Sequence, residues 1–266
     1  MLRKLIPFFI VAITWGMLIW AIFFAMHLKK QVLKKELTTA TIKPSWHKTI
    51  GDIPPPNGYQ RMHYARGSFA YFLQCLPLKK DKTVYLFNGE KKQNQTAQFA
   101  VINMSVGKEN LQQCADAVMR LWAEYWWERG DFKMISFIDN NRKKYRLQPN
   151  ASRSQFDRFL TNVFGMCGSY SLAKQLKPVS MKEMQCGDVL IRGGFPGHAV
   201  VVVDMAEHRL THKRMYMLAQ GYMPAQDIHV LNNPLRPTSP WYELNDTAAT
   251  IYTPQFWFKK WEFKRF

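Results

Sequence analysis

Residues 5–26 form an uninterrupted apolar stretch without a single charged side chain. As a helix this stretch would extend about 33 Å, against roughly 30 Å for the hydrocarbon core of a bilayer. Secretory signal peptides have shorter apolar regions, of about 7–15 residues, which end in small residues at a cleavage site. Here Phe23, Phe24 and Met26 stand near the end. The stretch therefore predicts a retained transmembrane anchor rather than a cleaved signal or a buried core helix.

We expect three parts: a membrane anchor over residues 1–30, a connector over 31–58 and one globular domain over 59–266. The connector ends in the sequence Ile-Pro-Pro-Pro-Asn-Gly, which is typical of a stiff extended segment that closes in a turn. Six cations flank the anchor, namely Arg3, Lys4, Lys29, Lys30, Lys34 and Lys35. This nearly balanced charge slightly favours a cytoplasmic body, but short N-terminal anchors commonly export the chain that follows. We therefore expect a single-pass membrane protein whose body lies on the exported side.

The chain is strongly basic, with 37 Lys and Arg against 19 Asp and Glu and a net charge of +18. No acid precedes Glu36, so the body keeps 31 cations against 19 acids after the six flanking cations are set aside. This excess favours an anionic partner, such as lipid headgroups or an envelope polymer or peptide. Nucleic acid is the partner that we expect least, because no zinc-finger, helix-turn-helix or RNA-binding signature accompanies the charge. The sequence does not indicate an oligomeric state.

The pattern of the body predicts an α+β fold with a mostly antiparallel sheet. Helical periodicity and helix-end signals predict three helices, over residues 109–129, 156–164 and 170–176. Apolar and β-branched runs predict strands over residues 83–87, 97–102, 189–191, 199–203, 215–219 and 228–231, and a hairpin over 135–147. The order is mixed rather than strictly alternating, which is why we expect antiparallel rather than parallel pairing.

The sequence offers no metal or cofactor signature. None of the four cysteines, Cys75, Cys114, Cys167 and Cys186, lies in a Cys-x-x-Cys pair. His208 and His212 have the helical spacing of metal ligands, but no helix and no third ligand accompany them. We therefore expect neither a metal nor a cofactor.

The segment from Cys167 to Asp204 carries the residues best suited to chemistry. Cys167 stands just ahead of a predicted helix, where the helix dipole and free N–H groups would lower the pKa of its thiol. His198 begins a strand after the Gly-rich turn at 193–197, and a cysteine–histidine pair is what nucleophilic catalysis needs. Gln220, on the next strand, is the nearest polar residue that could orient the imidazole. The alternatives are a buried apolar thiol and a histidine that bonds to backbone.

This order resembles the papain-like peptidases that cleave bacterial cell-wall peptides. In them a helix-initiating cysteine is followed by a Gly-Asp strand, here Gly187-Asp188, and then by a strand that bears a histidine. The resemblance covers the segment 167–220 and implies a papain-like core. It also implies Cys167 as the nucleophile, His198 as the base and Gln220 as the orienting residue.

A second resemblance covers most of the body. The segments 66–79, 111–125, 187–204, 218–231 and 239–242 resemble the bacterial family called domain of unknown function 4846. That family has no established activity, so the resemblance implies an architecture and no reaction. Its usual pattern at residues 166–169 is closer to Ala-Gly-Thr and has no cysteine. Ser169 would match the threonine, which makes it the second candidate nucleophile beside Cys167.

Further residues are candidates for ligand binding. Gly197 adjoins His198, and Tyr222 and Gln226 lie in the segment that follows Gln220; a tight corner with buried amides would explain the same residues. Asp116 and Arg120, on the predicted helix 109–129, are further candidates. Their spacing by four with Glu124 fits a structural ladder of ion pairs better than a catalytic set.

Two functions are consistent with these patterns. The first is a membrane-anchored envelope hydrolase that cleaves amide or peptide bonds through His198 and either Cys167 or Ser169. The alternative is a non-catalytic module on the same fold, either an envelope ligand-binding module or a scaffold for other membrane proteins. The sequence leaves open whether the protein is an enzyme.

The predicted anchor gives the first test. Full-length protein should sediment with membranes after cell lysis, and deletion of residues 1–30 should release the body into the soluble fraction, because the apolar stretch is then gone. Immunoblotting of both fractions measures the partition. Recovery of the intact chain, with its first methionine, from the soluble fraction would contradict the anchor.

Overall fold

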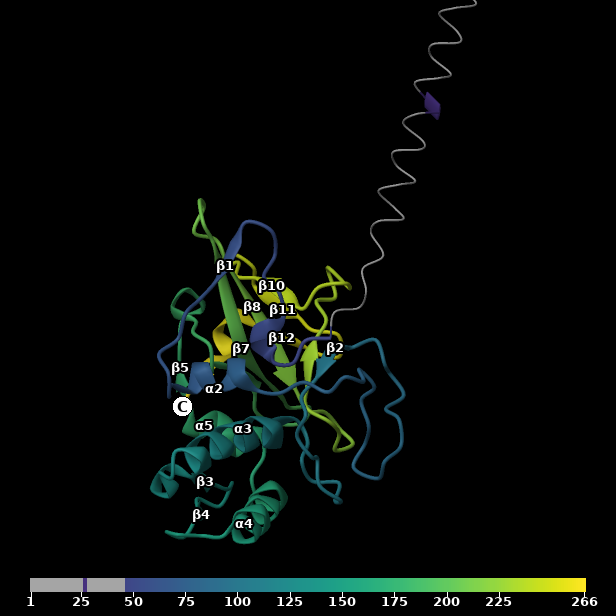
Figure 1. Cartoon of the computed structure of the whole chain (residues 1–266). Coiled ribbons are helices and arrows are strands. Elements are labelled where there is room, and N and C mark those ends of the chain that lie inside the picture. The colour runs from purple at the N-terminus through teal and green to yellow at the C-terminus, as the bar shows by residue number, and fades with distance from the viewer. Residues whose placement is uncertain (1–25, 28–45) are drawn as a thin grey trace, which may run out of the picture. The chain divides into compact units, whose positions relative to one another are not determined.

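The computed structural model describes residues 26–27 and 46–266 (Figure 1). The predicted anchor and most of the predicted connector lie outside these described residues. Within the described residues no helix has both the length and the apolar character needed to span a bilayer. The chain divides into two units, residues 1–46 and 47–266, and every element named below belongs to the second. Ile50 and Ile53, in the segment predicted as connector, are buried in the core of that unit.

A nine-stranded sheet forms the centre of this unit, and all of its paired strands are antiparallel. Its main path runs β2-β9-β8-β7-β6-β13-β5, while β1 also pairs with β7 and β10 with β8. These strands are β1 (Tyr59–Arg61), β2 (Gln98–Val101), β5 (Lys177–Pro178), β6 (Val189–Arg192), β7 (His198–His208), β8 (Arg214–Gln220), β9 (His229–Leu231), β10 (Trp241–Glu243) and β13 (Phe263–Arg265). The expected α+β fold with a mostly antiparallel sheet is therefore confirmed.

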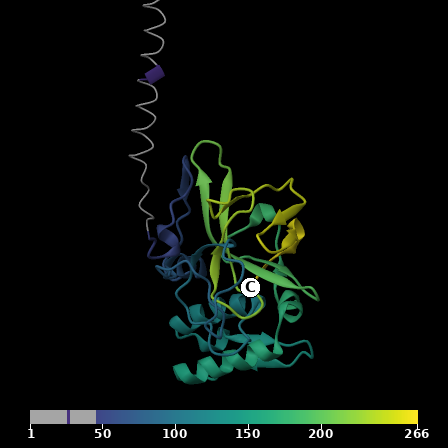
Figure 2. The ribbon, with the colours of Figure 1, turned by 90° about the vertical axis from the view of Figure 1, so that its right-hand side faces the viewer.

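The long hairpin of β7 and β8 is the axis of the sheet and stands upright, in green, in Figure 2. On the side away from β8, β7 pairs with two different strands: its start pairs with β6, and its end pairs with β1. Residues 198–206 of β7 are all buried, as the continuous apolar run predicted. The start of β7 and the end of β8 therefore lie side by side, deep in the molecule.

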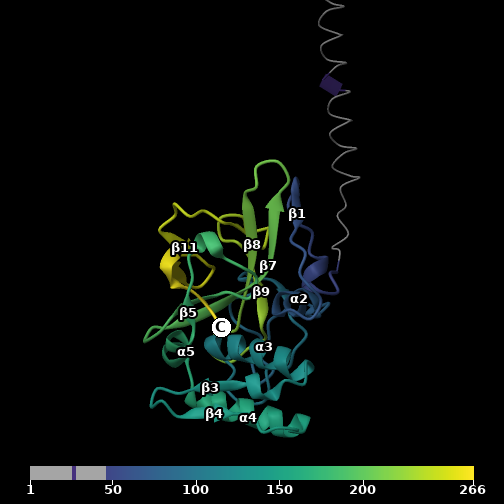
Figure 3. The same ribbon diagram turned by 90° about the vertical axis from the view of Figure 1, so that its left-hand side faces the viewer.

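Four helices and two small hairpins complete the described part of the unit. The helices are α2 (Phe69–Cys75), α3 (Cys114–Glu128), α4 (Arg153–Met166) and α5 (Ser169–Gln175). The hairpins are β3–β4 (Ser136–Ile138 and Lys144–Arg146) and β11–β12 (Thr250–Tyr252 and Trp257–Lys259). Helices α2 and α3 contact β7, and α5 contacts β6. Figure 3 shows α3 beneath the ends of the central strands, with α4 and the β3–β4 hairpin beyond it.

The ends of α3 differ from the sequence prediction in an informative way. We expected a helix from residue 109 to 129, but α3 begins at Cys114, because the side chain of Asp116 caps the backbone N–H of Gln113 at 3.0 Å. The helix ends at Glu128, one residue before the predicted end, and Gly130 follows with a φ of +69° that suits a glycine. The first turn of α3 is therefore built around Gln113, Cys114 and Asp116.

Most other predicted elements are confirmed, with one exception. The helices predicted at 156–164 and 170–176 correspond to α4 and α5, and the hairpin predicted at 135–147 corresponds to β3–β4. Residues 83–87, predicted as a strand, instead form a loop that makes only isolated bridges, at Tyr85 and Leu86. The apolar side chains of this run gave the strand signal, but no neighbouring strand pairs with the segment along its length.

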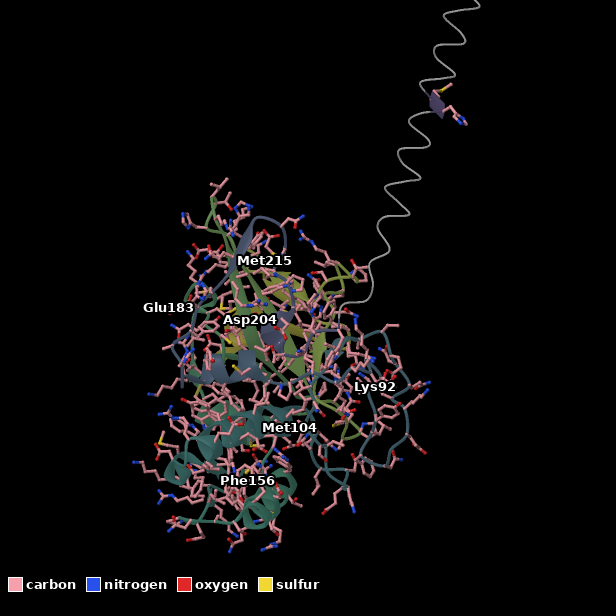
Figure 4. All side chains as sticks on the ribbon, viewed as in Figure 1. Lys92, Met104, Phe156, Glu183, Asp204 and Met215 are labelled. Carbon is pink, nitrogen blue, oxygen red and sulfur yellow. The ribbon has the colours of Figure 1, made fainter. Side chains whose placement is uncertain are left out.

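A buried ion pair joins the N-terminal part of the unit to the sheet. Asp204, in the middle of β7, is fully buried (Figure 4) and accepts hydrogen bonds from Arg61 Nε and Gln74 Nε2, both at 2.6 Å. The guanidinium of Arg61 also donates to the carbonyl oxygens of Gly51 and Ile53. Burial raises the pKa of Asp204, while Arg61 and Gln74 act in the opposite direction. Asp204 and Arg61 thus connect β7 to α2 and to the segment 51–53 through partly buried hydrogen bonds.

Replacement of Arg61 by alanine should destabilise the fold by about 3–5 kcal/mol, since it leaves the buried Asp204 without its counter-charge. Urea unfolding of the full-length chain in detergent, followed by tryptophan fluorescence, measures the change. Arg158→Ala is the matched control: Arg158 is exposed and donates to Ser154 Oγ on its own helix, so its loss should cost no more than about 0.5 kcal/mol. Equal effects of the two variants would show that the buried pair does not stabilise the domain.

Candidate functional site

A cavity of about 460 Å³ opens where β7 begins and β8 ends. Six segments meet at it: the first turn of α3 with the residues before it, the junction of α4 and α5, the loop 194–197 before β7, the segment after β8, and the turns of the β3–β4 and β11–β12 hairpins. Its walls are mainly apolar or neutral and include Phe164, Phe195, Tyr222, Met223 and Phe256. The cavity also contains Cys114, Asp116, Cys167, Ser169 and His198. The sequence-predicted candidates Cys167, Ser169, Gly197, His198, Tyr222 and Asp116 therefore share one cavity.

The Gly-rich turn before His198 is required by close packing against α5. A Cβ atom on Gly197 would overlap Ser169 Oγ and the carbonyl oxygen of Gly194. One on Gly193 would lie 3.0 Å from the Cα atom of Tyr170. These glycines let the loop lie against the start of α5, so that His198 enters β7 facing the cavity. For Gly197 the structure thus gives a packing reason, beside the binding role that the sequence suggested.

The imidazole of His198 is held by Gln220 across the β7–β8 hairpin. His198 Nε2 and Gln220 Oε1 are 2.8 Å apart, and both side chains are almost fully buried. The rings of Tyr222 and Phe256 contact the imidazole, with centroids 5.0 Å and 5.1 Å away. The prediction that Gln220 is the polar neighbour of His198 on the next strand is therefore confirmed as geometry.

A chain of buried hydrogen bonds determines which nitrogen of His198 carries the proton. The carbonyl oxygen of Asp227 lies 2.9 Å from His229 Nδ1, which must therefore be the protonated nitrogen of that ring. His229 Nε2 is then an acceptor, and the amide nitrogen of Gln220 donates to it at 3.3 Å. The oxygen of Gln220 consequently faces His198 and accepts from its Nε2–H. His198 Nδ1 is left as the basic nitrogen.

Two more side chains complete this network. The second N–H of the Gln220 amide donates to Gln255 Oε1 at 3.1 Å, and Lys92 Nζ donates to the same oxygen at 2.7 Å. Lys92 comes from the loop beside the sheet that is seen in Figure 4 and is buried there. Burial lowers the pKa of Lys92 to about 8. All the polar atoms of the Gln220 amide are thus satisfied inside the protein.

Burial also keeps both histidines neutral. It lowers the pKa of His198 to about 4 and that of His229 to about 3, and the positive charge of Lys92 acts in the same direction on each. The hydrogen bond with Gln220 opposes the shift at His198. At neutral pH His198 is therefore an uncharged imidazole that can accept a proton at Nδ1.

Cys114 is the residue that the sequence analysis missed. It is the first residue of α3 and lines the cavity together with His198. Burial and then Asp116 raise the pKa of the Cys114 thiol to about 11, whereas the N–H groups of Ala115 and Ala199 favour the thiolate. The missed signal was the Gln113–Asp116 capping pair, which would have moved the predicted helix start from residue 109 to Cys114.

Cys167 and Ser169 line the cavity from the junction of α4 and α5. Cys167 terminates α4 and precedes α5, a helix of only seven residues. The expectation that its position would lower the pKa of its thiol is wrong: burial, with Asp139 and Asp116, raises that pKa to about 12. Among the described residues His198 makes no hydrogen bond with Cys114, Cys167 or Ser169; the partner of its imidazole is Gln220.

The remaining binding candidates divide into two groups. Tyr222 lies in the cavity against His198, and its hydroxyl donates to the carbonyl oxygen of Gln255 at 3.4 Å. Gln226 is fully buried behind the network, and its amide has no hydrogen-bond partner in the described structure. Arg120 bonds to Glu124 at 2.7 Å, as the predicted ladder required, but Asp116 does not join that ladder. Asp116 instead lines the cavity and stays a candidate for ligand binding, whereas Arg120 belongs to the ion pair with Glu124.

The described residues contain no group of three or more His, Cys, Asp or Glu side chains that could hold a metal ion. Polar atoms in the cavity thus come from isolated side chains and from the free N–H groups of the first turn of α3.

The fold and the cavity define an α+β domain that positions a cysteine at a helix start beside a strand-borne histidine. The family model described as "Domain of unknown function (4846)" matches residues 51–148 and 138–265, and the chain belongs to this family. No curated protein and no solved structure matches the chain.

The low pKa values of the two histidines predict acid sensitivity. A histidine whose pKa is lowered by folding contributes stability above its ordinary pKa of about 6.5, and this stability is lost as the pH falls toward the folded value. Each histidine should therefore lower the unfolding free energy by about 1–3 kcal/mol between pH 6.5 and 4, while Asp116, whose pKa is raised to about 8, acts in the opposite direction. The decrease should be smaller in His229→Gln, which keeps a polar side chain but has no proton to gain.

Urea titrations at half-unit pH steps measure this difference. His63→Gln serves as the control, because His63 is exposed and its loss should leave the acid slope of the wild type unchanged. An identical slope in wild type and His229→Gln would mean that His229 is not held neutral in the folded protein.

Proposed function

We propose that this protein is a cysteine hydrolase with a papain-like core, which cleaves amide or peptide bonds in the cell envelope. Cys114 is the nucleophile, His198 the general base and acid, and Gln220 the residue that orients the imidazole. The observation that carries the proposal is the buried hydrogen-bond chain that leaves His198 Nδ1 basic in the cavity that also contains the Cys114 thiol. A thiol, a neutral imidazole and an orienting amide are the parts that this type of catalysis requires.

Three observations favour Cys114 over Cys167 and Ser169 as the nucleophile. Cys114 begins a helix of fifteen residues, whereas Cys167 and Ser169 adjoin a helix of seven. Backbone N–H groups around Cys114 favour its thiolate, while nothing among the causes that act on the Cys167 pKa does so. Helix α3, which begins with Cys114, also packs against β7, which begins with His198, and both residues line the cavity. The order helix-borne cysteine, strand-borne histidine and amide on the next strand is the one expected of papain-like peptidases.

The reaction follows from these positions. His198 Nδ1 takes the proton of the Cys114 thiol, and the sulfur attacks the scissile carbonyl carbon. Free N–H groups in the first turn of α3 can stabilise the oxyanion that forms. His198 then gives its proton to the leaving nitrogen, so the C–N bond breaks and an acyl-thioester remains on Cys114. Water, deprotonated by the same imidazole, hydrolyses the thioester and releases the acid.

Gln220 supports both halves of this cycle. Its oxygen bonds the Nε2–H of the neutral ring and also of the imidazolium, so the ring keeps its orientation while Nδ1 gains and loses the proton. Because the pKa of His198 is low, the protonated imidazolium is unstable on its own. It forms when a thiolate or oxyanion beside it supplies a negative charge. Proton transfer and thiolate attack are therefore coupled.

We further propose that the anchor over residues 1–30 tethers this hydrolase to the membrane, on the exported side. Support comes from the length of the apolar stretch and from the positive charge of the body, which suits an anionic envelope surface. The substrate would then be an amide or peptide of the envelope within reach of the tether.

The proposal is tested with full-length protein and peptidoglycan fragments, analysed by mass spectrometry. Wild type should release new cleavage products, and Cys114→Ala and His198→Ala should each reduce the rate by at least about 1,000-fold, because each removes a reacting group. Cys167→Ala and Ser169→Ala are the matched controls from the same cavity and should retain most of the activity.

Each outcome selects one of the candidates. Loss of activity in Cys167→Ala or Ser169→Ala, with Cys114→Ala unaffected, would show that the residue whose replacement abolishes activity, and not Cys114, is the nucleophile. Equal product formation by wild type, Cys114→Ala and His198→Ala would exclude hydrolysis at this site and favour the non-catalytic ligand-binding module.

A further inference from the structure

The cavity differs in charge from the protein that contains it. The chain carries a net charge of +18, yet no lysine or arginine is among the residues that line the cavity in the described structure. Asp116 is the one carboxylate in that lining. Lys92 lies behind Tyr222 rather than in the lining, so the acidic side chain that a substrate group would contact directly is Asp116. The cavity and the basic outer surface are suited to opposite charges.

Asp116 has unused capacity for a hydrogen bond. Its side chain is 6% exposed, and its Oδ2 accepts the backbone N–H of Gln113 at 3.0 Å. Its Oδ1 has no hydrogen-bond partner in the described structure. A buried carboxylate oxygen without a partner is destabilising, and burial accordingly raises the pKa of Asp116 to about 8 while no cation among the described residues pairs with it. Helix capping accounts for Oδ2 only.

The position of Asp116 relates it directly to the proposed nucleophile. Asp116 is two residues after Cys114 in the first turn of α3, which corresponds to about 3 Å of rise along the helix axis. Its charge acts on the pKa of both Cys114 and Cys167, and all three residues line the same cavity. A group bound to Asp116 would therefore be close to the scissile carbonyl.

We propose that Asp116 binds a free, protonated amino group of the substrate, close to the bond that is cleaved. This inference rests on the proposed hydrolase and gives its substrate class: amides or peptides with an unblocked amino group on the acyl residue. The ammonium supplies the donor that Oδ1 lacks and neutralises the carboxylate. Asn110, Gln113 and Asn140, which also line the cavity, offer neutral amides to the rest of such a substrate.

The first experiment compares short synthetic peptides that are identical except for a free or an acetylated N-terminus, with full-length wild type and Asp116→Asn. The wild type should show a kcat/KM for the free amine roughly 10- to 100-fold above that for its acetylated partner, the range typical of a charged hydrogen bond. In Asp116→Asn, whose amide oxygen can still cap Gln113, this ratio should fall to about one. Asp131→Asn, a change of an exposed carboxylate away from the cavity, should leave the ratio as in wild type.

The second experiment needs no turnover. In the full-length Cys114→Ser variant, saturation-transfer NMR compares binding of glycinamide with that of N-acetylglycinamide. Glycinamide should give the stronger signal, and addition of Asp116→Asn should remove the difference.

The two experiments separate failure of this inference from failure of the hydrolase. Cleavage that depends on Cys114 but shows no preference for the free amine would overturn the role of Asp116 and leave the hydrolase standing. A preference for glycinamide that depends on Asp116, with no cleavage of any peptide, would support the amine site while the hydrolase fails. Absence of the preference in both experiments would overturn the inference.

Discussion

The side-chain amide of Gln220 is the group on which the arrangement of the cavity depends. It is buried at the end of β8, where water cannot satisfy its one acceptor and two donors. His198, His229 and Gln255 satisfy all three, and the backbone carbonyl of Asp227 fixes the direction of the chain. Each atom left without a partner would cost about 1–3 kcal/mol, so the network has one favourable arrangement. That arrangement sets the tautomer of His198.

Close backbone packing brings the helix start to this network. Gly221 follows β8, and a Cβ atom on it would lie 2.7 Å from the carbonyl oxygen of Gln113 and 3.0 Å from the Ala117 side chain. The absence of that atom lets the end of β8 lie against the first turn of α3. Helix α3, which begins with Cys114, thereby packs against β7. Two glycine-permitted contacts, at Gly197 and Gly221, thus place α5 and α3 on either side of His198.

The net charge of +18 does not describe the cavity, because no lysine or arginine is among its lining residues in the described structure. The net positive charge of the body fits the proposed attachment to an anionic envelope surface. The cavity, lined by neutral residues and one carboxylate, suits a different chemical group. A protein with this distribution can stay bound to an anionic surface while its cavity selects a substrate by an amino group. Attachment and selection then use different residues and can be altered separately.

The sequence by itself determined the α+β class, the antiparallel sheet and the family, since these follow from local patterns and from motifs that extend over most of the body. It also identified His198 and Gln220, because neighbouring strands of a hairpin place such residues side by side. It did not single out Cys114, since the apolar periodicity of residues 109–129 concealed where the helix begins. Only the tertiary structure brought Cys114, Asp116 and His198 into one cavity, because that proximity arises from packing of α3 on the sheet rather than from spacing along the chain. The pKa of Cys167 was also beyond the sequence, because burial, which raises it, depends on the whole fold.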